Sequence, residues 1–228
     1  MRFKRVIKSM EKKRMYTIIA ASQNKGKIQE MEIITKEFGM EIIPRDDAGI
    51  EDIEIVEDKE TFEENSLKKA KEIMNLCGKV TIADDSGLEV DALGGAPGVH
   101  SARYAGDERD DQKNRDKLLL DLEGVPFEKR TARFVSVISM AYPDGTEIIA
   151  RGECEGHIIF EERGQNGFGY DCLFVPIGYD QTFGELSSEE KNKISHRSNA
   201  LWLLKEKLGK QNVEKKIVSN DPAWDKTV

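Results

Sequence analysis

The chain has 228 residues, of which 38% are hydrophobic and 34% are charged. This composition is sufficient for a folded core and argues against a fully disordered chain, and no apolar run approaches the roughly 18 residues that a membrane-spanning helix needs. The net charge of −8 argues against a domain-wide affinity for nucleic acid, although it is compatible with a local basic pocket.

The three cysteines indicate the redox compartment of the protein, and the composition of the two terminal segments indicates the bounds of the predicted domain. Cys77, Cys154 and Cys172 are widely spaced, which argues against a disulfide framework and favours a reducing, cytoplasmic location. The first 15 residues contain seven basic side chains and one acidic one, and the apolar run after them is too short for a secretory signal. We interpret residues 1–15 as a disordered or weakly ordered extension, with a targeting segment as the alternative, and residues 211–228 as a tail.

Strands and helices alternate in the first part of the predicted domain, residues 16–210. Short apolar runs predict strands, while helical spacing, a good N-cap and a closing glycine predict helices. The predicted strands lie at 16–22, 41–44 and 80–83. Three helices are predicted: the first follows Asn24, the second runs from a capping box at Thr61 to Gly78, and the third spans 111–122. The acidic segment at 46–60 is predicted to be a loop or an edge.

The second part of the domain is richer in β-structure. Residues 130–142 alternate as in a half-buried strand, a Pro-Asp-Gly turn follows, and residues 147–154 return as the hairpin partner. One continuous helix is predicted for residues 188–208. Alternating strands and helices with an inserted hairpin predict the α/β class, an α/β sandwich around a mixed sheet.

The first candidate site follows the first strand. A helix N-terminus presents unpaired N–H groups to an anion, a glycine permits close approach and lysines add positive charge, so a phosphate is a suitable ligand. From this segment alone, an ordinary turn with solvated lysines is the favoured interpretation, because no Walker A pattern is present. The candidate residues are Ser22, Gln23, Asn24, Lys25, Gly26 and Lys27.

The second candidate site is the Asp84-Asp85-Ser86-Gly87 run after the strand at 80–83. We expect the strand to deliver both carboxylates to a turn at its end, where open α/β sheets bind ligands. Adjacent carboxylates repel each other, and Mg²⁺ would relieve this because it prefers one or two carboxylates with waters and phosphate oxygens. The alternative is an exposed Asx turn.

The third candidate site is the glycine-rich segment from Gly167 to Asp171. Phe168 lies between Gly167 and Gly169 and could present its ring to a base, while Asp171 could accept a proton from the edge of that base. By itself the segment is a weak signal, and an ordinary packed phenylalanine is an equal alternative.

The fourth candidate site is the run from Lys191 to Arg197. In one helix Lys193 and Arg197 would be neighbours four residues apart, with His196 beside them. A plain basic helix face is the alternative interpretation of this run.

Together these segments resemble the inosine triphosphate pyrophosphatase family. The matching stretches occur in the order found in that family and extend over about residues 16 to 208, and the stretch from Ile82 to Gly106 is the most specific of them. They read SQNKGKI, TFEENSLKKA, IADDSGLEVDALGGAPGVHSARYAG, NGFGYDCLF and EEKNKISHR. The resemblance implies a two-lobed α/β fold around a long mixed sheet, a homodimer, and Mg²⁺-dependent cleavage of purine nucleoside triphosphates with a deaminated base, such as ITP, dITP and XTP, to the monophosphate and pyrophosphate.

The resemblance also implies a role for each candidate residue. Asp85 is the general base and a metal ligand, Glu57 is the second ligand, and Asp84 assists catalysis. The phosphates are held by Lys27, Lys69, Lys191, Asn24 and the backbone of residues 22–27, and Ser86 also contacts the substrate. Phe168, in the Gly169-Tyr170 loop, stacks on the base, and Asp171, His196 and Arg197 read its edge.

Two positions depart from the pattern of the family. Gln23 replaces a small residue, which could alter the backbone of the phosphate loop, and Cys172 replaces a proline, which could loosen the loop that holds the base. Neither change removes a charged or metal-binding group. We therefore expect these positions to affect fine specificity more than activity.

Two other functions compete with this interpretation. A phosphatase that forms an aspartyl-phosphate would also place acidic residues at a strand end, but it needs Asp-x-Asp, whereas here Ser86 follows the Asp84-Asp85 pair. A regulator that binds nucleotides without cleaving them would retain only the binding residues, and the intact carboxylates argue against it.

Overall fold

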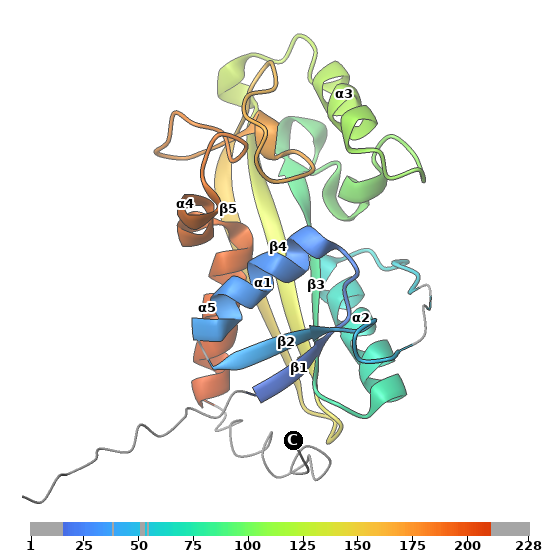
Figure 1. The fold of residues 1–228 in the computed structure, drawn as a ribbon. Coiled ribbons are helices and arrows are strands. Elements are labelled where there is room, and N and C mark those ends of the chain that lie inside the picture. The colour runs from blue at the N-terminus through green and yellow to red at the C-terminus, as the bar shows by residue number, and fades with distance from the viewer. Residues whose placement is uncertain (1–15, 38, 51–52, 54, 211–228) are drawn as a thin grey trace, which may run out of the picture.

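The computed structural model describes residues 16–37, 39–50, 53 and 55–210, and the predicted N-terminal extension and C-terminal tail lie outside these residues. Its centre is a six-stranded mixed sheet with the order β2-β1-β3-β4-β5-β6 (Figure 1). Strand β1 is parallel to β2 and β3, and the other neighbours are antiparallel, which confirms the predicted mixed α/β sheet. The strands are β1 (Tyr16–Ala20), β2 (Met40–Pro44), β3 (Thr81–Val90), β4 (Thr131–Ala141), β5 (Glu147–Ile158) and β6 (Phe174–Pro176).

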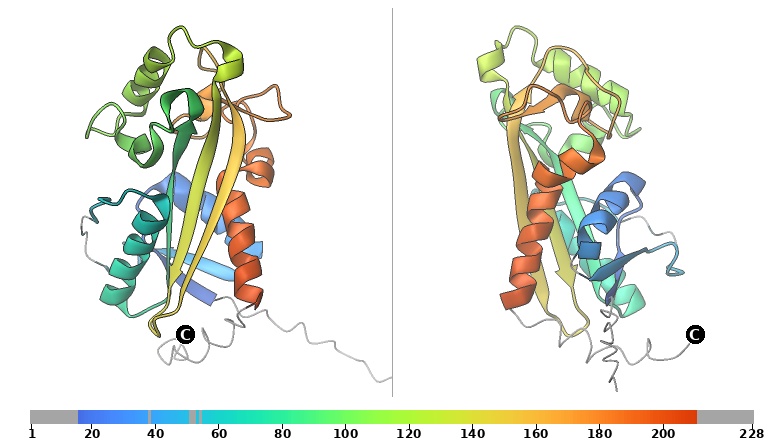
Figure 2. Two further views of the ribbon diagram at one scale, coloured as in Figure 1. Left: turned by 180° about the vertical axis from the view of Figure 1, so that it is seen from behind. Right: turned by 60° about the vertical axis from the view of Figure 1, so that its left-hand side comes forward.

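Helices cover both faces of the lower half of the sheet (Figure 2). Helices α1 (Lys25–Glu37) and α5 (His196–Lys210) pack on one face, and α2 (Phe62–Cys77) packs on the other. Successive strand residues point to opposite faces, so Ile18 and Ile82 lie under α1 and α5, whereas Ile19 and Ala83 lie near α2. Strand β3 therefore carries side chains into two different helical layers.

The predicted helix ends follow from local side-chain chemistry. Asn24 Oδ1 accepts a hydrogen bond from the Lys27 N–H at 3.1 Å, and Thr61 Oγ1 accepts one from the Glu64 N–H at 3.2 Å, so both residues are N-caps. The Glu64 carboxylate accepts a hydrogen bond from the Thr61 hydroxyl and not from the Thr61 N–H. Only one of the two hydrogen bonds of a capping box, the one from the Glu64 N–H, is therefore formed. Gly78 closes α2 in the left-handed conformation with φ 65°.

The upper lobe is built on the far ends of the long strands. Strands β3, β4 and β5 extend through both lobes, and above them lie α3 (Asp111–Asp121) and two 3₁₀ helices at Asp91–Leu93 and Gly98–Arg103 (Figure 1). The second hydrophobic core includes Leu88, Leu118, Phe134 and Phe174. The two lobes predicted from the resemblance thus share one continuous sheet, and β5 reaches four residues beyond its predicted end at 154.

Two sequence-based predictions about elements are wrong. Strand β3 does not end at Ala83 but continues to Val90, because residues 81–90 pair with β4 along their whole length. The predicted helix at 188–208 is two helices, α4 (Ser188–Ile194) and α5, because Ser195 has an extended backbone with ψ 153°. Lys193 and Arg197 are therefore not neighbours on one helix face.

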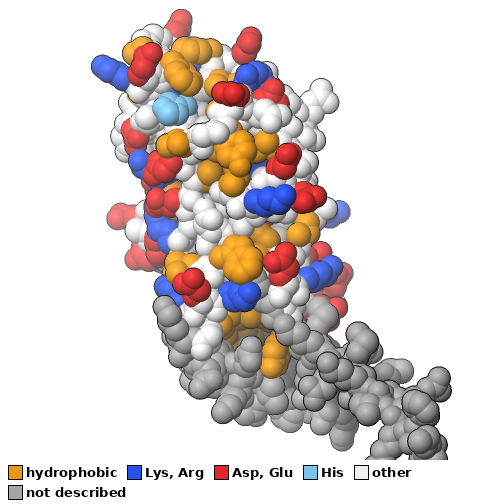
Figure 3. Space-filling view, turned by 90° about the vertical axis from the view of Figure 1, so that its left-hand side faces the viewer, with side chains coloured by type: hydrophobic (Ala, Val, Ile, Leu, Met, Phe, Trp, Pro, Cys, Tyr) orange, Lys and Arg blue, Asp and Glu red, His pale blue; other side chains and the backbone are white. Residues whose placement is uncertain are grey.

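The surface carries mixed charges. Figure 3 shows acidic and basic side chains interspersed with apolar ones on one side of the molecule, without a continuous basic area on that side. In the part of the chain that the structure describes, no helix is both long and apolar enough to cross a bilayer. Cys77, Cys154 and Cys172 are free thiols, as expected from their spacing.

Candidate active site

The site begins where β1 stops. Strand β1 pairs with β3 only at Thr81 and Ile82, so the following residues of β3 face open space on that edge. Asp84 and Asp85 are therefore in the middle of a strand, not in a turn, and the Asx-turn alternative is wrong as well. Because adjacent strand residues point to opposite faces, the two carboxylates enter different helical layers, and this separation reduces the repulsion expected for a shared turn.

Asp84 lies on the α1 and α5 side and is enclosed by donors. Lys27 Nζ lies 2.8 Å from Asp84 Oδ2, Ser136 donates to Asp84 Oδ1 at 2.5 Å, and Arg197 donates to both oxygens at 3.4 and 3.2 Å. Burial raises the pKa of Asp84, but the charges of Arg197 and Lys27 and the bond from Ser136 outweigh it and hold the pKa well below its usual value. Asp84 is thus a permanent anion that orders its cationic neighbours.

Asp85 lies on the α2 side and shares a lysine with Glu57. Lys69 Nζ donates to Asp85 Oδ1 at 2.7 Å and to Glu57 Oε1 at 2.6 Å. Burial raises the pKa of Asp85 above its usual value, and the Glu57 charge adds to this, while Lys69 and Lys27 partly offset it. Burial also raises the pKa of Glu57, but Lys69, Lys27 and Arg109 outweigh it and lower that pKa. The pKa values of the two carboxylates that share Lys69 are thus shifted in opposite directions.

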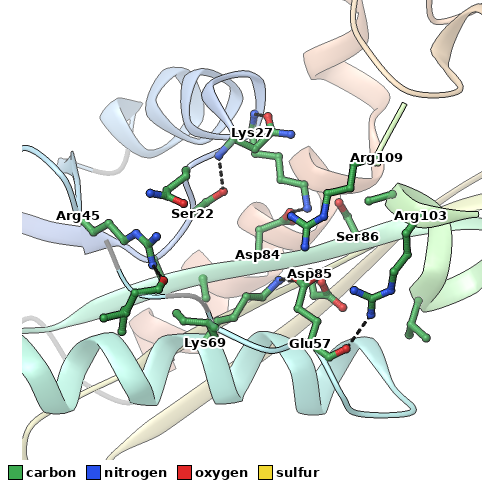
Figure 4. Close-up of a pocket in the computed structure, with 18 of the residues that line it drawn as sticks. Ser22, Lys27, Arg45, Glu57, Lys69, Asp84, Asp85, Ser86, Arg103 and Arg109 are labelled. Carbon is green, nitrogen blue, oxygen red and sulfur yellow. Dashed lines mark hydrogen bonds and ion pairs between the residues drawn. The ribbon is translucent and has the colours of Figure 1, made fainter. Parts of the chain in front are cut away.

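A cavity of about 650 Å³ opens in front of these carboxylates. Figure 4 shows Lys27 reaching toward them from α1 and Lys69 from α2, with Arg103 and Arg109 entering from the upper lobe. Among the described residues, five basic and four acidic side chains line the cavity, which suits a polyanion with a bound cation better than an apolar ligand. The charged residues are Lys27, Arg45, Lys69, Arg103, Arg109, Glu57, Asp84, Asp85 and Asp107.

The carboxylates of the larger cavity suit a divalent cation, although they do not form a complete set of ligands around one. Among the described residues, no group of three or more His, Cys, Asp or Glu side chains is arranged to hold a metal. Mg²⁺ does not need such a group, because one or two carboxylates with waters and substrate phosphates suffice. Glu57 and Asp85 meet at the Lys69 ammonium, and the raised pKa of Asp85 indicates that this pair would accept further positive charge.

A second cavity of about 110 Å³ adjoins the first, and the two share four lining residues, Asn24, Lys27, Ser86 and Ala102. The Phe168 ring lies along its wall, and a Cβ atom on Gly26 would be only 2.9 Å from that ring. Gly26 is therefore needed for contact with Phe168, whereas the sequence suggested contact with a phosphate. A planar ring beside a charged cavity can hold the base of a nucleotide whose phosphates occupy the larger space.

Asp171 organises the loop that carries Phe168. Its Oδ2 atom accepts the Phe168 N–H at 2.9 Å and the Lys191 ammonium at 2.7 Å, and Lys191 also donates to Glu30 at 2.9 Å. Gly167 has φ 76°, and a Cβ atom there would be 2.0 Å from Asp171 Oδ2, so only glycine fits. The structure places Lys191 at the smaller cavity, away from Lys69.

His196 and Arg197 lie at the first turn of α5, where both are buried. His196 stacks on Phe134 with ring centroids 4.8 Å apart, and its Nδ1 atom is buried without a partner among the described residues. Burial, with the charges of Arg197 and Lys191, lowers the pKa of His196 well below its usual value, so the ring is neutral at physiological pH. The guanidinium of Arg197 bonds to Asp84, Glu30 and Ser86, so the alternative interpretation as a plain basic helix face is wrong.

Residues 18–207 match the Ham1 family. The chain belongs to this family. A dITP/XTP pyrophosphatase of Haemophilus influenzae is 52% identical over 193 residues, which cover 84% of this chain and 98% of the relative, and one of Bacillus cereus is 46% identical over 197 residues, which cover 85% and 95%. The resemblance to the inosine triphosphate pyrophosphatase family, drawn from the motifs above, is thereby confirmed.

Solved structures of Ham1 proteins have the same fold. The Staphylococcus aureus Ham1 protein gives a TM-score of 0.76 at 42% identity, covering 86% of this chain and 99% of that one. The structure described as a nucleoside-triphosphatase / dITP/XTP pyrophosphatase from Mycobacterium abscessus gives a TM-score of 0.68 at 42% identity. The match covers 82% of this chain and 97% of that one. The matched region contains every candidate site residue named above.

The Ham1 motifs do not contribute equally to the two cavities. Ser22, Gln23, Asn24 and Lys27 line the larger one, whereas Lys25 lies outside both. Gly169 and Tyr170 line the smaller one, and the Tyr170 hydroxyl donates to the Ser101 carbonyl at 2.8 Å. Four of the six residues predicted at the first strand–helix junction thus line the larger cavity.

Several residues of this Ham1 site were missed from the sequence. Glu30 pairs with Lys191 and Arg197, and Arg103 donates to the Glu57 carbonyl at 2.7 Å. Glu30 sits on α1 two positions after the matched motif, where it resembles any solvated helix residue. Arg103 belongs to the 82–106 stretch, and its basic side chain in that specific stretch was a signal for a phosphate contact. The other missed lining residues include Arg45, Asp107, Arg109, Ser101, Asp111 and Phe134.

Proposed function

We propose that this Ham1 protein is a Mg²⁺-dependent hydrolase that cleaves ITP, dITP and XTP to the nucleoside monophosphate and pyrophosphate. The adjacency of the two cavities supports this proposal most strongly. A ring-lined space of about 110 Å³ lies beside a charged space of about 650 Å³, and Asn24, Lys27 and Ser86 line both. A base can thus occupy the smaller space while its triphosphate reaches Asp85. The names of the curated relatives indicate the same substrate class.

The chemical step follows from the position of Asp85. Water attacks the α-phosphorus, its proton passes to Asp85, and the bond to the α–β bridging oxygen breaks, with the electron pair staying on that oxygen as pyrophosphate leaves. A base must be partly desolvated and basic enough to take the proton, and burial raises the pKa of Asp85 in this way. Lys69 holds Asp85 Oδ1 in place at 2.7 Å, and Lys27 adds positive charge beside the phosphates.

Mg²⁺ would be held by Glu57 and Asp85, the two carboxylates that meet at Lys69. When bound, a divalent cation neutralises phosphate charge and lowers the pKa of a coordinated water. Asp84 faces the other side of β3 and is already occupied by Lys27, Arg197 and Ser136. Its role is to keep those cations in position.

Selection of the base depends on which buried donors and acceptors lack partners. Hypoxanthine presents an acceptor at position 6, where adenine presents an amino donor. The neutral His196 ring and the Lys191 ammonium lie in the smaller cavity with Phe168. A donor from His196 or Lys191 to the 6-oxo group would face the amino group of adenine, and unpaired buried groups can reject a substrate by a factor of roughly 10⁴.

Asp171 and Arg197 support this pocket through other residues. Asp171 Oδ2 is already bonded to Lys191 and to the Phe168 N–H, and the Arg197 guanidinium is bonded to carboxylates. We therefore assign base contact to Phe168, His196 and Lys191, and positioning to Asp171 and Arg197. The homodimer, the cytoplasmic location and the absence of a nucleic-acid partner stay predictions.

We expect Glu57→Gln to raise the Mg²⁺ concentration that gives half-maximal activity by at least tenfold, while the KM for ITP at saturating Mg²⁺ changes little. The reason is that the variant keeps the shape of the side chain but removes one of two anionic ligands. Metal titrations of ITP hydrolysis measure this directly. Asp58→Asn is the matched control, because Asp58 is a neighbouring exposed carboxylate paired with Lys68. Superimposable titrations for wild type and Glu57→Gln would assign the ligand to another residue.

The products of ITP hydrolysis test the proposed reaction. Chromatography of the nucleotides, together with separate assays for pyrophosphate and orthophosphate, distinguishes the two anhydride bonds. We expect IMP and pyrophosphate in equal amounts. Formation of IDP and orthophosphate would contradict the proposed geometry, and tight binding of ITP without turnover would favour the nucleotide-binding regulator.

A further inference from the structure

Arg109 differs from the other basic residues of the larger cavity. Lys27 and Lys69 pair with carboxylates, Arg45 donates to the Ile53 carbonyl at 3.1 Å, and Arg103 donates to the Glu57 carbonyl at 2.7 Å. Among the residues that the structure describes, none forms a hydrogen bond or ion pair with the Arg109 guanidinium. The side chain is exposed, and yet it lines the cavity.

The backbone of Arg109 is constrained in an unfavourable conformation. Its φ of 52° is the only positive value at a residue other than glycine within the described segments. Left-handed backbone is uncommon for a side chain such as arginine, and strain of this kind gathers at functional sites. The next residue, Asp110, is the N-cap of α3, and it accepts hydrogen bonds from the N–H groups of Gln112 and Lys113 at 2.9 and 3.1 Å. Arg109 thus directly precedes the capped start of α3.

The guanidinium of Arg109 points into the larger cavity. Figure 4 shows the Arg109 side chain coming down from the upper lobe toward the region of Asp84, Asp85 and Ser86. Arg109 is also close enough to contribute, after burial and the charges of Lys69 and Lys27, to the pKa of Glu57. It does not line the smaller cavity, so it faces the space for phosphates and not the space for the base.

We propose that Arg109 binds the pyrophosphate portion of the substrate and stabilises it as the leaving group. This inference rests on the proposed function. A guanidinium presents a planar set of donors that matches phosphate oxygens, and in Arg109 these donors form no hydrogen bond or ion pair with the described residues. Charge on the bridging oxygen and the pyrophosphate grows as the α–β bond breaks, so a cation placed there favours the transition state.

Inorganic pyrophosphate and IMP are the ligands that separate this role from a general effect on the site. We expect Arg109→Asn to raise the Kd for pyrophosphate about tenfold, the size of one charged hydrogen bond at an exposed position, and to leave the Kd for IMP unchanged. Asparagine is suitable because it tolerates the left-handed backbone. Arg109→Lys, which keeps the charge but loses the planar donors, should lie between wild type and Arg109→Asn.

Calorimetric titration of each variant in Mg²⁺-containing buffer gives these constants. Lys113→Asn is the control, because Lys113 is an exposed cation nearby that pairs with Glu108 and lies outside both cavities. Equal pyrophosphate affinities in wild type and Arg109→Asn would overturn the inference, and so would equal losses for pyrophosphate and IMP, which indicate a loop distortion. A wild-type protein that binds pyrophosphate but leaves ITP intact would contradict the proposed function instead.

Discussion

Asp85→Asn is expected to lower kcat for ITP by about 10²- to 10⁴-fold while the protein stays folded. Asparagine keeps the shape of the side chain but can neither take a proton nor supply charge to a cation. Burial raises the pKa of Asp85 above its usual value, so in wild type the rate should fall as the pH drops through this raised pKa, at a higher pH than for an ordinary aspartate. Rates measured from acidic to neutral pH, with circular dichroism of both proteins, test this expectation.

A matched variant separates the base from a general charge effect. Asp107 also lines the larger cavity, but it is exposed and its carboxylate forms none of the described ion pairs. Asp107→Asn removes the same charge from the same cavity and should keep activity within a few-fold of wild type. If Asp85→Asn retained similar activity, or if its acid limb were unchanged, Asp85 would not be the general base.

Arg197→Gln is expected to lower the free energy of unfolding by about 3–5 kcal/mol, because it leaves the buried Asp84 carboxylate and Glu30 without their shared cation. The guanidinium is 1% exposed, and three of its nitrogens are bonded to Asp84, Glu30 and Ser86. ITP hydrolysis should fall as well, because Asp84 also orders Lys27. Denaturant titration and kcat/KM measurements report both effects.

A second variant and a second substrate keep this prediction testable. Asp84→Asn combined with Arg197→Gln removes the charges at both ends of the pair and should be more stable than Arg197→Gln alone. A positioning role for Arg197 predicts that the ratio of kcat/KM for ITP and ATP changes by less than about tenfold. If the ratio collapsed while stability stayed at the wild-type value, Arg197 would read the base directly and the positioning role would be wrong.

The local features of the fold could be predicted because local chemistry determines them. Asn24 and Thr61 cap their helices through contacts within three residues, and Gly78 adopts a conformation that few other residues accept. The course of β3 could not be predicted in this way. Asp-Asp-Ser-Gly has strong turn preferences, and these are overridden by pairing with β4, a strand about 50 residues later in the chain.

The candidate site likewise contains residues that the sequence could predict and long-range contacts that it could not. The family resemblance pointed to Asp85, Lys69 and Glu57, and in the structure Lys69 Nζ lies 2.6 Å from Glu57 and 2.7 Å from Asp85. The resemblance did not show that Asp84 faces away from Asp85, because that follows from strand geometry. Glu30 was missed because its partner Arg197 lies 167 positions away in the sequence. Long-range ion pairs of this kind become visible only in the folded chain.

The rate of pyrophosphate release from a panel of nucleotides tests whether this protein selects purine nucleoside triphosphates with a deaminated base. ITP, dITP, XTP, GTP, ATP and dTTP should be compared at equal concentration, with Mg²⁺ and with EDTA. We expect rapid release from ITP, dITP and XTP, rates at least about 100-fold lower from the other three, and no release with EDTA. Comparable rates for ATP and ITP, or full activity in EDTA, would contradict it.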